Sequence, residues 1–280
     1  MSIATRSGSA AVGATVQVLD ASDPAAFIRA AAGVSNIFLC TNPPYTDWAA
    51  RWTPIFDATI AAASNTGARI VMMGNLYPYG SPSGVMTEHS PETTTEAKGR
   101  IRRAGWAKMR AAHDAGDIRA VEVRASDYFG PGVTGTAHLG ESFFTAVLRS
   151  KTAHVVGEPQ LAHSWSYLPD IVTTLIAAAD HTGDWGRIWH VPSGAMSRTD
   201  IAAQLNAHFG TRGKVSGYPP WLLRSLGLVN PMMHEVWASS YQFVVPYISD
   251  STETERELRV TATPWKKALV ATAESYRRVE

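Results

Sequence analysis

The order of apolar runs along the first half of the chain constrains the fold most strongly. Residues 15–19, 36–40, 68–73 and 120–125 have the composition of short buried strands, and stretches with helical spacing separate them. The run 68–73 keeps its apolar residues consecutive rather than alternating, which is typical of a strand covered on both faces. Strands that alternate with helices through short turns predict an α/β fold with a doubly wound parallel sheet.

Polar residues mark where several helices should begin. Asp23, Asp170 and Ser197 each stand at the start of a helical pattern, where a side-chain N-cap is expected. The helical pattern over 48–63 contains Pro54, which should bend or delay that helix. After residue 130 the elements become shorter, and the tail from residue 218 is rich in Trp, Leu, Met and Pro.

Composition excludes several classes of function. The formal net charge is +1, so no overall field attracts nucleic acid or an anionic membrane. No apolar run reaches the roughly 18 residues of a membrane helix, and the first twenty residues lack a signal-peptide pattern. The single cysteine, Cys40, fits a reducing compartment and is expected to be a small buried apolar residue. No metal-ligand spacing occurs. We therefore expect a cytoplasmic protein with a small-molecule substrate and no metal.

Five short segments occur in an order that carries further information. They are 4–8 (ATRSG), the pair Asp20 and Asp23, 70–80 ending in Tyr79-Gly80, 123–132 (VRASDYFGPG) and 164–170 (SWSYLPD). Together they resemble the extended short-chain dehydrogenase/reductase superfamily, in its NAD-dependent epimerase/dehydratase branch. The resemblance implies a Rossmann-like core over 1–135 and about 160–192, with a smaller substrate-side lobe over 136–159 and 193–280.

The same resemblance implies where a dinucleotide would bind. The cofactor is NADP or NAD, and an arginine after the second Rossmann strand favours NADP. The implied cofactor contacts are Arg6, Asp20, Ala21, Thr41, Asn42 and Pro43. Two of them have a structural alternative, because Arg6 can be a frayed terminal residue and Asp20 can cap the next turn.

One family feature is missing, namely a first strand followed by a glycine-rich turn that lets the backbone approach the pyrophosphate. We expect the start codon to be misassigned or the gene to be truncated. A literal G-x-G-x-x-G does occur at 130–135, with Glu158 as the matching ribose acid. Pro131 stiffens that turn and five residues separate it from the next helix, which favours a rigid loop beside the active site.

The catalytic positions also depart from the family. The Tyr-x-x-x-Lys pair falls on Lys98 and Arg102, which keep the i, i+4 spacing and share a helix face. The serine or threonine position falls on Asn75, and Tyr77 is the nearest phenol. Asn75 and Tyr77 would polarise the reacting oxygen, while Lys98 and Arg102 would hold ribose or substrate.

A second group of polar residues, Ser126, Asp127 and Tyr128, follows the strand 120–125, where substrate contacts are expected. Asp127 has the alternative of forming an Asx turn. The implied function is an NAD(P)-dependent oxidoreductase or epimerase/dehydratase acting on a small hydroxyl or carbonyl compound. The alternative is the same scaffold without redox activity, as a cofactor-independent isomerase or cyclase, or a non-catalytic NADP sensor. Family members usually dimerise through the helices placed here at 48–63 and 98–115, so we expect a homodimer.

Overall fold

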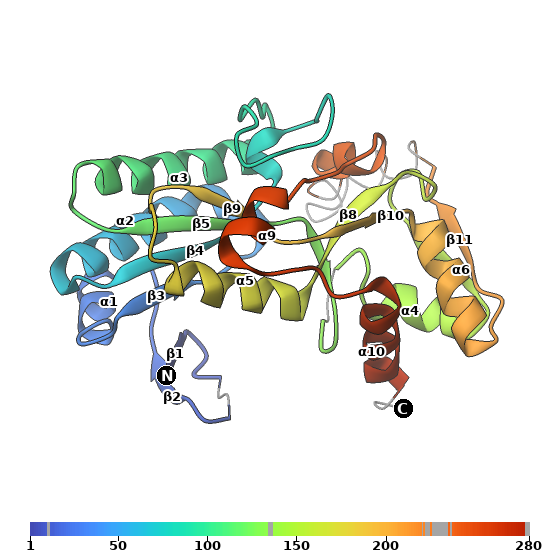
Figure 1. The fold of residues 1–280 in the computed structure, drawn as a ribbon, viewed down its shortest axis with the longest axis horizontal. Helices are drawn as coiled ribbons and strands as arrows, with labels where there is room; N and C mark the ends of the chain where they lie inside the picture. Colours follow the sequence, from blue (N-terminus) through green and yellow to red (C-terminus); the bar gives the residue numbers. More distant parts are fainter. Residues whose placement is uncertain are drawn as a thin grey trace.

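A four-stranded parallel sheet in the order β3-β4-β5-β9 forms the centre of the chain (Figure 1). Its strands are Asn36–Leu39, Arg69–Asn75, Ala120–Ala125 and Ile188–His190. The computed structural model describes residues 1–9, 12–133, 137–219, 221, 225, 235 and 237–277.

Helices cover both faces of this sheet. Three of them, α1 to α3, form one layer, and α5 lies on the opposite face (Figure 1). Their bounds are Pro24–Ala30, Trp48–Thr66, Ala97–Asp114 and Leu168–Asp180. Successive residues of β4 serve the two layers, because Ile70 and Met72 pack with α2 and α3 whereas Val71 packs with α5. The expected Rossmann-like, doubly wound α/β fold is therefore confirmed.

A second, two-stranded parallel sheet lies apart from the first. It consists of β1 (Ser2–Thr5) and β2 (Thr15–Val18), and it shares no strand pairing with the four-stranded sheet. Within the described residues, β3 therefore forms an edge of the four-stranded sheet. On β3, Phe38 is 43 % exposed.

In the described residues, the C-terminal lobe combines two small sheets with the helices α4, α6 and α10 (Figure 1). Its strands are β6 (Asp127–Phe129), β7 (Thr152–Val155), β8 (His163–Tyr167), β10 (Gly194–Met196) and β11 (Lys214–Gly217). Its helices are α4 (Glu141–Leu148), α6 (Arg198–Phe209) and α10 (Trp265–Arg277). β8 lies between β6 and β10 in one of these sheets. Because β6 begins two residues after β5 ends, this sheet lies next to the carboxyl ends of the central strands.

The structure tests the expected helix boundaries. Asp23 and Ser197 are confirmed as N-caps, since the side chain of each accepts a hydrogen bond from the backbone N–H three residues on. The expected delay at Pro54 does not occur, because α2 begins at Trp48 and continues through Pro54 to Thr66. Pro54 is exposed and has no N–H to donate to the backbone carbonyl four residues earlier in the helix, so that carbonyl can bind water instead. The expectation that Asp170 is an N-cap is wrong, because Asp170 lies in the first turn of α5. Its carboxylate accepts hydrogen bonds from Thr263 instead.

No helix in the described part of the chain is long and apolar enough to cross a membrane. In the same residues, His, Cys, Asp and Glu side chains form no group of three that could hold a metal ion.

Candidate active site

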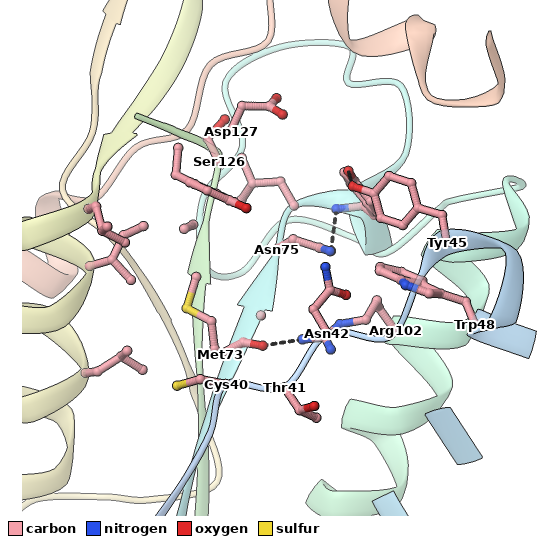
Figure 2. A pocket seen from close by; sticks show the side chains of 18 of the residues that line it. Cys40, Thr41, Asn42, Tyr45, Trp48, Met73, Asn75, Arg102, Ser126 and Asp127 are labelled. Atoms are coloured by element: carbon pink, nitrogen blue, oxygen red, sulfur yellow. Dashed lines mark hydrogen bonds between the residues drawn. The ribbon is translucent and has the colours of Figure 1, made fainter. Parts of the chain in front are cut away.

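A cavity of about 440 Å³ opens where the central strands end. The segment after β3, the end of β4 and the β5–β6 junction supply its polar groups, and α5 supplies an apolar wall. Figure 2 shows Ser126 and Asp127 at one end, Cys40 and Thr41 at the opposite end, and Tyr45 with Trp48 along one side. The carboxyl ends of parallel strands are the usual ligand sites of such sheets.

Two phenols face each other on the wall of this cavity. Tyr77 is the first residue of the 3₁₀ helix η2 (Tyr77–Tyr79), and Tyr45 begins η1 (Tyr45–Asp47). Their hydroxyl oxygens lie 3.1 Å apart and share a hydrogen bond, while the Tyr77 N–H donates to Asn75 Oδ1 at 3.2 Å. Burial raises the pKa of both tyrosines, so both hold their protons at neutral pH. The pair can therefore donate a proton in a hydrogen bond to a ligand oxygen.

Asp127 occupies the other polar end of the cavity. Its Oδ2 accepts a hydrogen bond from His163 Nε2 at 2.9 Å, and Ser126 Oγ lies 3.4 Å from the same nitrogen. His163 comes from β8, which runs parallel to β6 and so brings the ring beside Asp127. Burial by itself raises the pKa of Asp127, but the hydrogen bond and charge of His163 outweigh it, so this pKa lies below the ordinary carboxyl value. Asp127 thus makes a tertiary contact rather than the Asx turn weighed from the sequence.

The two cations of α3 are held by protein partners. Lys98 Nζ donates to a carboxylate oxygen of Glu235 at 2.6 Å and lies 5.2 Å from the centre of the Tyr45 ring. The Arg102 guanidinium donates to the Met73 carbonyl, and burial lowers the pKa of Arg102 to about 10. Arg102 lines the cavity, whereas Lys98 supports Tyr45 from outside it.

Gly99, between these cations, sets the distance between α3 and η2. A Cβ at this position would lie against Thr94 Oγ1 and 2.5 Å from the Tyr77 carbonyl oxygen. The helix can approach Tyr77 this closely only without a side chain at residue 99. The local sequence therefore brings Tyr77 to the cavity through a helix–loop contact that requires glycine.

The candidate cofactor residues fall into two groups. Thr41 and Asn42 line the cavity, and the Pro43 carbonyl next to them accepts a hydrogen bond from Trp48 Nε1 at 2.9 Å. The other three, Arg6, Asp20 and Ala21, do not line it. Asp20 accepts hydrogen bonds from the Ser22 N–H and hydroxyl, and it forms a salt bridge with Arg51 at 3.2 Å. Arg6 is exposed, and Ala21 packs against the core formed by α1 and α2.

The predicted substrate residues Ser126, Asp127 and Tyr128 all line the cavity, together with Asn75 and Tyr77. The described part of the G-x-G-x-x-G segment, residues 130–133, lies between β6 and α4, and the last two residues of the motif lie outside the described residues. Glu158, its proposed ribose acid, is exposed.

Three residues of this site were missed or misjudged from the sequence. Tyr45 follows two prolines and His163 precedes a motif, and neither stands in a pattern that signals its role. The expectation of a buried Cys40 is wrong, since Cys40 is exposed and lines the cavity. The alternation of β3 explains this, because Ile37 and Leu39 point into the core.

Solved structures share this fold at low sequence identity. The UDP-glucose 4-epimerase of Thermotoga maritima, with UDP-glucose, superposes with a TM-score of 0.79 over 99% of this chain and 90% of the epimerase, at 14% identity. MoeE5, in complex with UDP-glucuronic acid and NAD, gives 0.76 over 99% and 90% of the two chains at 16% identity. The dTDP-glucose 4,6-dehydratase DesIV of Streptomyces venezuelae, with NAD bound, gives 0.72 over 92% and 78% at 18% identity.

No curated protein sequence matches the chain. A family model does match, over residues 9–191, which is more than half of the chain. That span contains the four-stranded sheet and almost the whole cavity wall. The chain belongs to the NAD dependent epimerase/dehydratase family.

Proposed function

We propose that the chain is an NAD(P)-dependent oxidoreductase or epimerase/dehydratase that acts on a small hydroxyl or carbonyl compound. The observation that carries this proposal is the cavity at the strand ends, where two phenols and a carboxylate meet an apolar wall. Family membership and the NAD in the MoeE5 and DesIV structures support nicotinamide chemistry in this cavity.

The residues present fit the nicotinamide half of a dinucleotide. Thr41 and Asn42 offer hydroxyl and amide groups on the cavity wall. Arg102 Nε is buried and has no hydrogen-bond partner among the described residues, so it keeps a donor for a ribose hydroxyl or a substrate oxygen. When bound, the nicotinamide would accept or donate a hydride. Asn75 and Tyr77 would orient and polarise the substrate oxygen, and Lys98 would hold Tyr45 in place.

Direct binding tests the proposal. Titration of the chain with NADH and NADPH, followed by nicotinamide fluorescence, should give saturable binding. Thr41→Val removes one cavity hydroxyl and should weaken binding about threefold to tenfold, the value of one hydrogen bond. Thr46→Val is the matched control, because Thr46 is exposed and outside the cavity wall. A folded wild-type chain that binds neither nucleotide would contradict the proposal and favour the scaffold without redox activity.

The choice of dinucleotide rests on Arg6. Its exposed guanidinium follows the last residue of β1, where it is free to meet the 2′-phosphate of NADP. We therefore propose a preference for NADPH. Arg6→Gln should lower the affinity for NADPH and leave that for NADH unchanged.

We also propose a homodimer formed through α2 and α3. The two helices pack side by side in one layer, and Lys108 of α3 pairs with Asp57 of α2 (Figure 1). Light scattering on the purified chain should give twice the monomer mass of 30.2 kDa. A monomer at micromolar concentration would contradict this proposal.

A further inference from the structure

Three polar groups that can move or hold a proton line the same cavity. Asp127 comes from the β5–β6 junction and Tyr45 from the segment after β3 (Figure 2). Tyr77 comes from the segment after β4. Burial raises the pKa of both phenols, and the charge of Asp127 adds to this rise. A carboxylate opposite phenolic donors in an apolar cavity is an arrangement suited to removing a proton next to a carbonyl.

We propose that this cavity is a proton-transfer site in which Asp127 exchanges the α-proton of a bound carbonyl compound, while one hydroxyl of the hydrogen-bonded pair Tyr45 and Tyr77 donates to the carbonyl oxygen. The activity goes beyond the proposed hydride transfer, because it needs no nicotinamide. The chemical class of ligand is a small ketone or aldehyde with an acidic neighbouring C–H bond and a largely apolar body.

The Asp127 carboxylate has one oxygen bound within the protein. Its Oδ2 accepts the hydrogen bond from His163, while the Asp127 side chain remains 15 % exposed and forms part of the cavity wall. Within the described residues, the second carboxylate oxygen is therefore available to a ligand. With a pKa below the ordinary value, Asp127 is ionised at neutral pH and able to accept a proton.

His163 faces a hydrogen-bond acceptor at each ring nitrogen. Nε2 lies 2.9 Å from Asp127 Oδ2, and Nδ1 lies 3.3 Å from the Gln242 carbonyl oxygen. The ring is therefore held in position from both sides. It also stacks on Phe243, with the ring centroids 4.9 Å apart. His163 thus fixes and stabilises the Asp127 carboxylate and is a positioning residue.

The two phenols together leave one hydroxyl proton for a ligand. In the 3.1 Å contact between Tyr45 and Tyr77, one hydroxyl donates to the other, and the second proton remains for a ligand oxygen. The Tyr77 backbone is held by Asn75 and by the close approach of Gly99, so the donor is fixed before a ligand arrives. Preorganised donors of this kind stabilise an oxyanion most effectively in an apolar site.

The proposed step balances without an oxidant or reductant. An Asp127 oxygen takes the α-proton, and the electron pair of the C–H bond forms the C=C bond of an enolate. The carbonyl π pair moves to the oxygen, which accepts the phenol hydrogen bond. Asp127 then returns a proton to the same carbon, which gives exchange with solvent, or to another carbon of the enolate system, which gives isomerisation.

The experiment measures loss of α-protons in D₂O by proton NMR, with no nicotinamide present. The probes are 2-tetralone, an apolar ketone, and hydroxyacetone, a small hydroxylated one. The wild-type chain should accelerate exchange of at least one probe in a saturable manner. Asp127→Asn should slow that exchange roughly 100-fold or more, the usual contribution of a general base. Tyr77→Phe should slow it by roughly 10-fold or more.

Asp117→Asn is the matched control, because Asp117 is exposed on the turn between α3 and β5 and lies outside the cavity wall. Circular dichroism establishes that each variant is folded. Since Asp127→Asn and Tyr77→Phe alter different elements, one variant still tests the proposal if the other fails to fold. Exchange of both probes at the buffer rate with the wild-type chain, or equal rates in the wild type and the folded Asp127→Asn, would overturn the proposal.

His163→Gln separates positioning from a merely structural role. Loss of the His163 hydrogen bond and charge should raise the pKa of Asp127 and move the lower limb of the pH–rate profile to higher pH. The groups that interact electrostatically with Asp127 are His138, His163, Arg198, Tyr45, Tyr77, Tyr241 and Tyr247. An unchanged profile in the folded variant would contradict the role of His163. NADH binding is measured separately, so failure of the proposed redox function and failure of this proposal give different results.

Discussion

The buried histidine His190, at the end of β9, should make the fold sensitive to mild acid. Its Nδ1 lies 2.8 Å from the Asp250 carbonyl oxygen and donates to it, and its Nε2 accepts from the Tyr79 hydroxyl at 2.8 Å. The neutral ring therefore has both nitrogens satisfied. Burial lowers the pKa of His190 to about 4 in the folded chain, against about 6.5 when unfolded.

Between these two values the unfolded chain binds more protons than the folded chain, so stability falls as the pH drops from about 6.5 towards 4. At pH 5 the loss from His190 is about 2 kcal/mol. Urea unfolding of the wild type and His190→Gln at pH 7 and pH 5 measures this term. The variant should lose about 2 kcal/mol less than the wild type, whereas the exposed His208→Gln should behave like the wild type. Equal losses in the wild type and His190→Gln would refute the reasoning.

Two further predictions concern single contacts. Gly99→Ala should displace Tyr77 and destabilise the chain by about 1–3 kcal/mol, the cost of overpacking, although alanine is the better helix former. Gly84→Ala is the control and should leave stability unchanged, because open space surrounds Gly84. Equal thermal midpoints for the two variants would contradict the predicted overpacking at Gly99. Asp170→Asn should lower the free energy of unfolding by about 2 kcal/mol, because the Asp170 carboxylate accepts hydrogen bonds from the Thr263 N–H and hydroxyl at 2.7 and 2.6 Å. An unchanged urea midpoint would argue against that contact.

The regular elements of the core could be predicted because their signals are local. The consecutive apolar residues of β4 and the cap at Asp23 both follow from residues a few positions apart. The short strands of the lobe could not be predicted in this way. β8 has the sequence HSWSY, and its polar residues are buried between β6 and β10, so only the tertiary pairing makes it a strand.

The candidate site could be predicted only in part for the same reason. Asn75, Ser126 and Asp127 stand at strand ends, and their place in the sheet follows from that position alone. Tyr45 lines the cavity beside Tyr77, 32 residues away, and His163 contacts Asp127, 36 residues away, and no local pattern encodes either contact.

We propose that the cavity at the strand ends receives the nicotinamide, and Cys40 offers the most direct test. Cys40 lines that cavity and is the single cysteine of the chain, so its alkylation reports directly on occupation of the cavity. Mass spectrometry can follow iodoacetamide labelling of the wild type at rising concentrations of NADPH or NADH. The labelling rate should fall saturably, in parallel with the fluorescence titration. An unchanged rate at saturating nucleotide would show that the nicotinamide does not occupy this cavity.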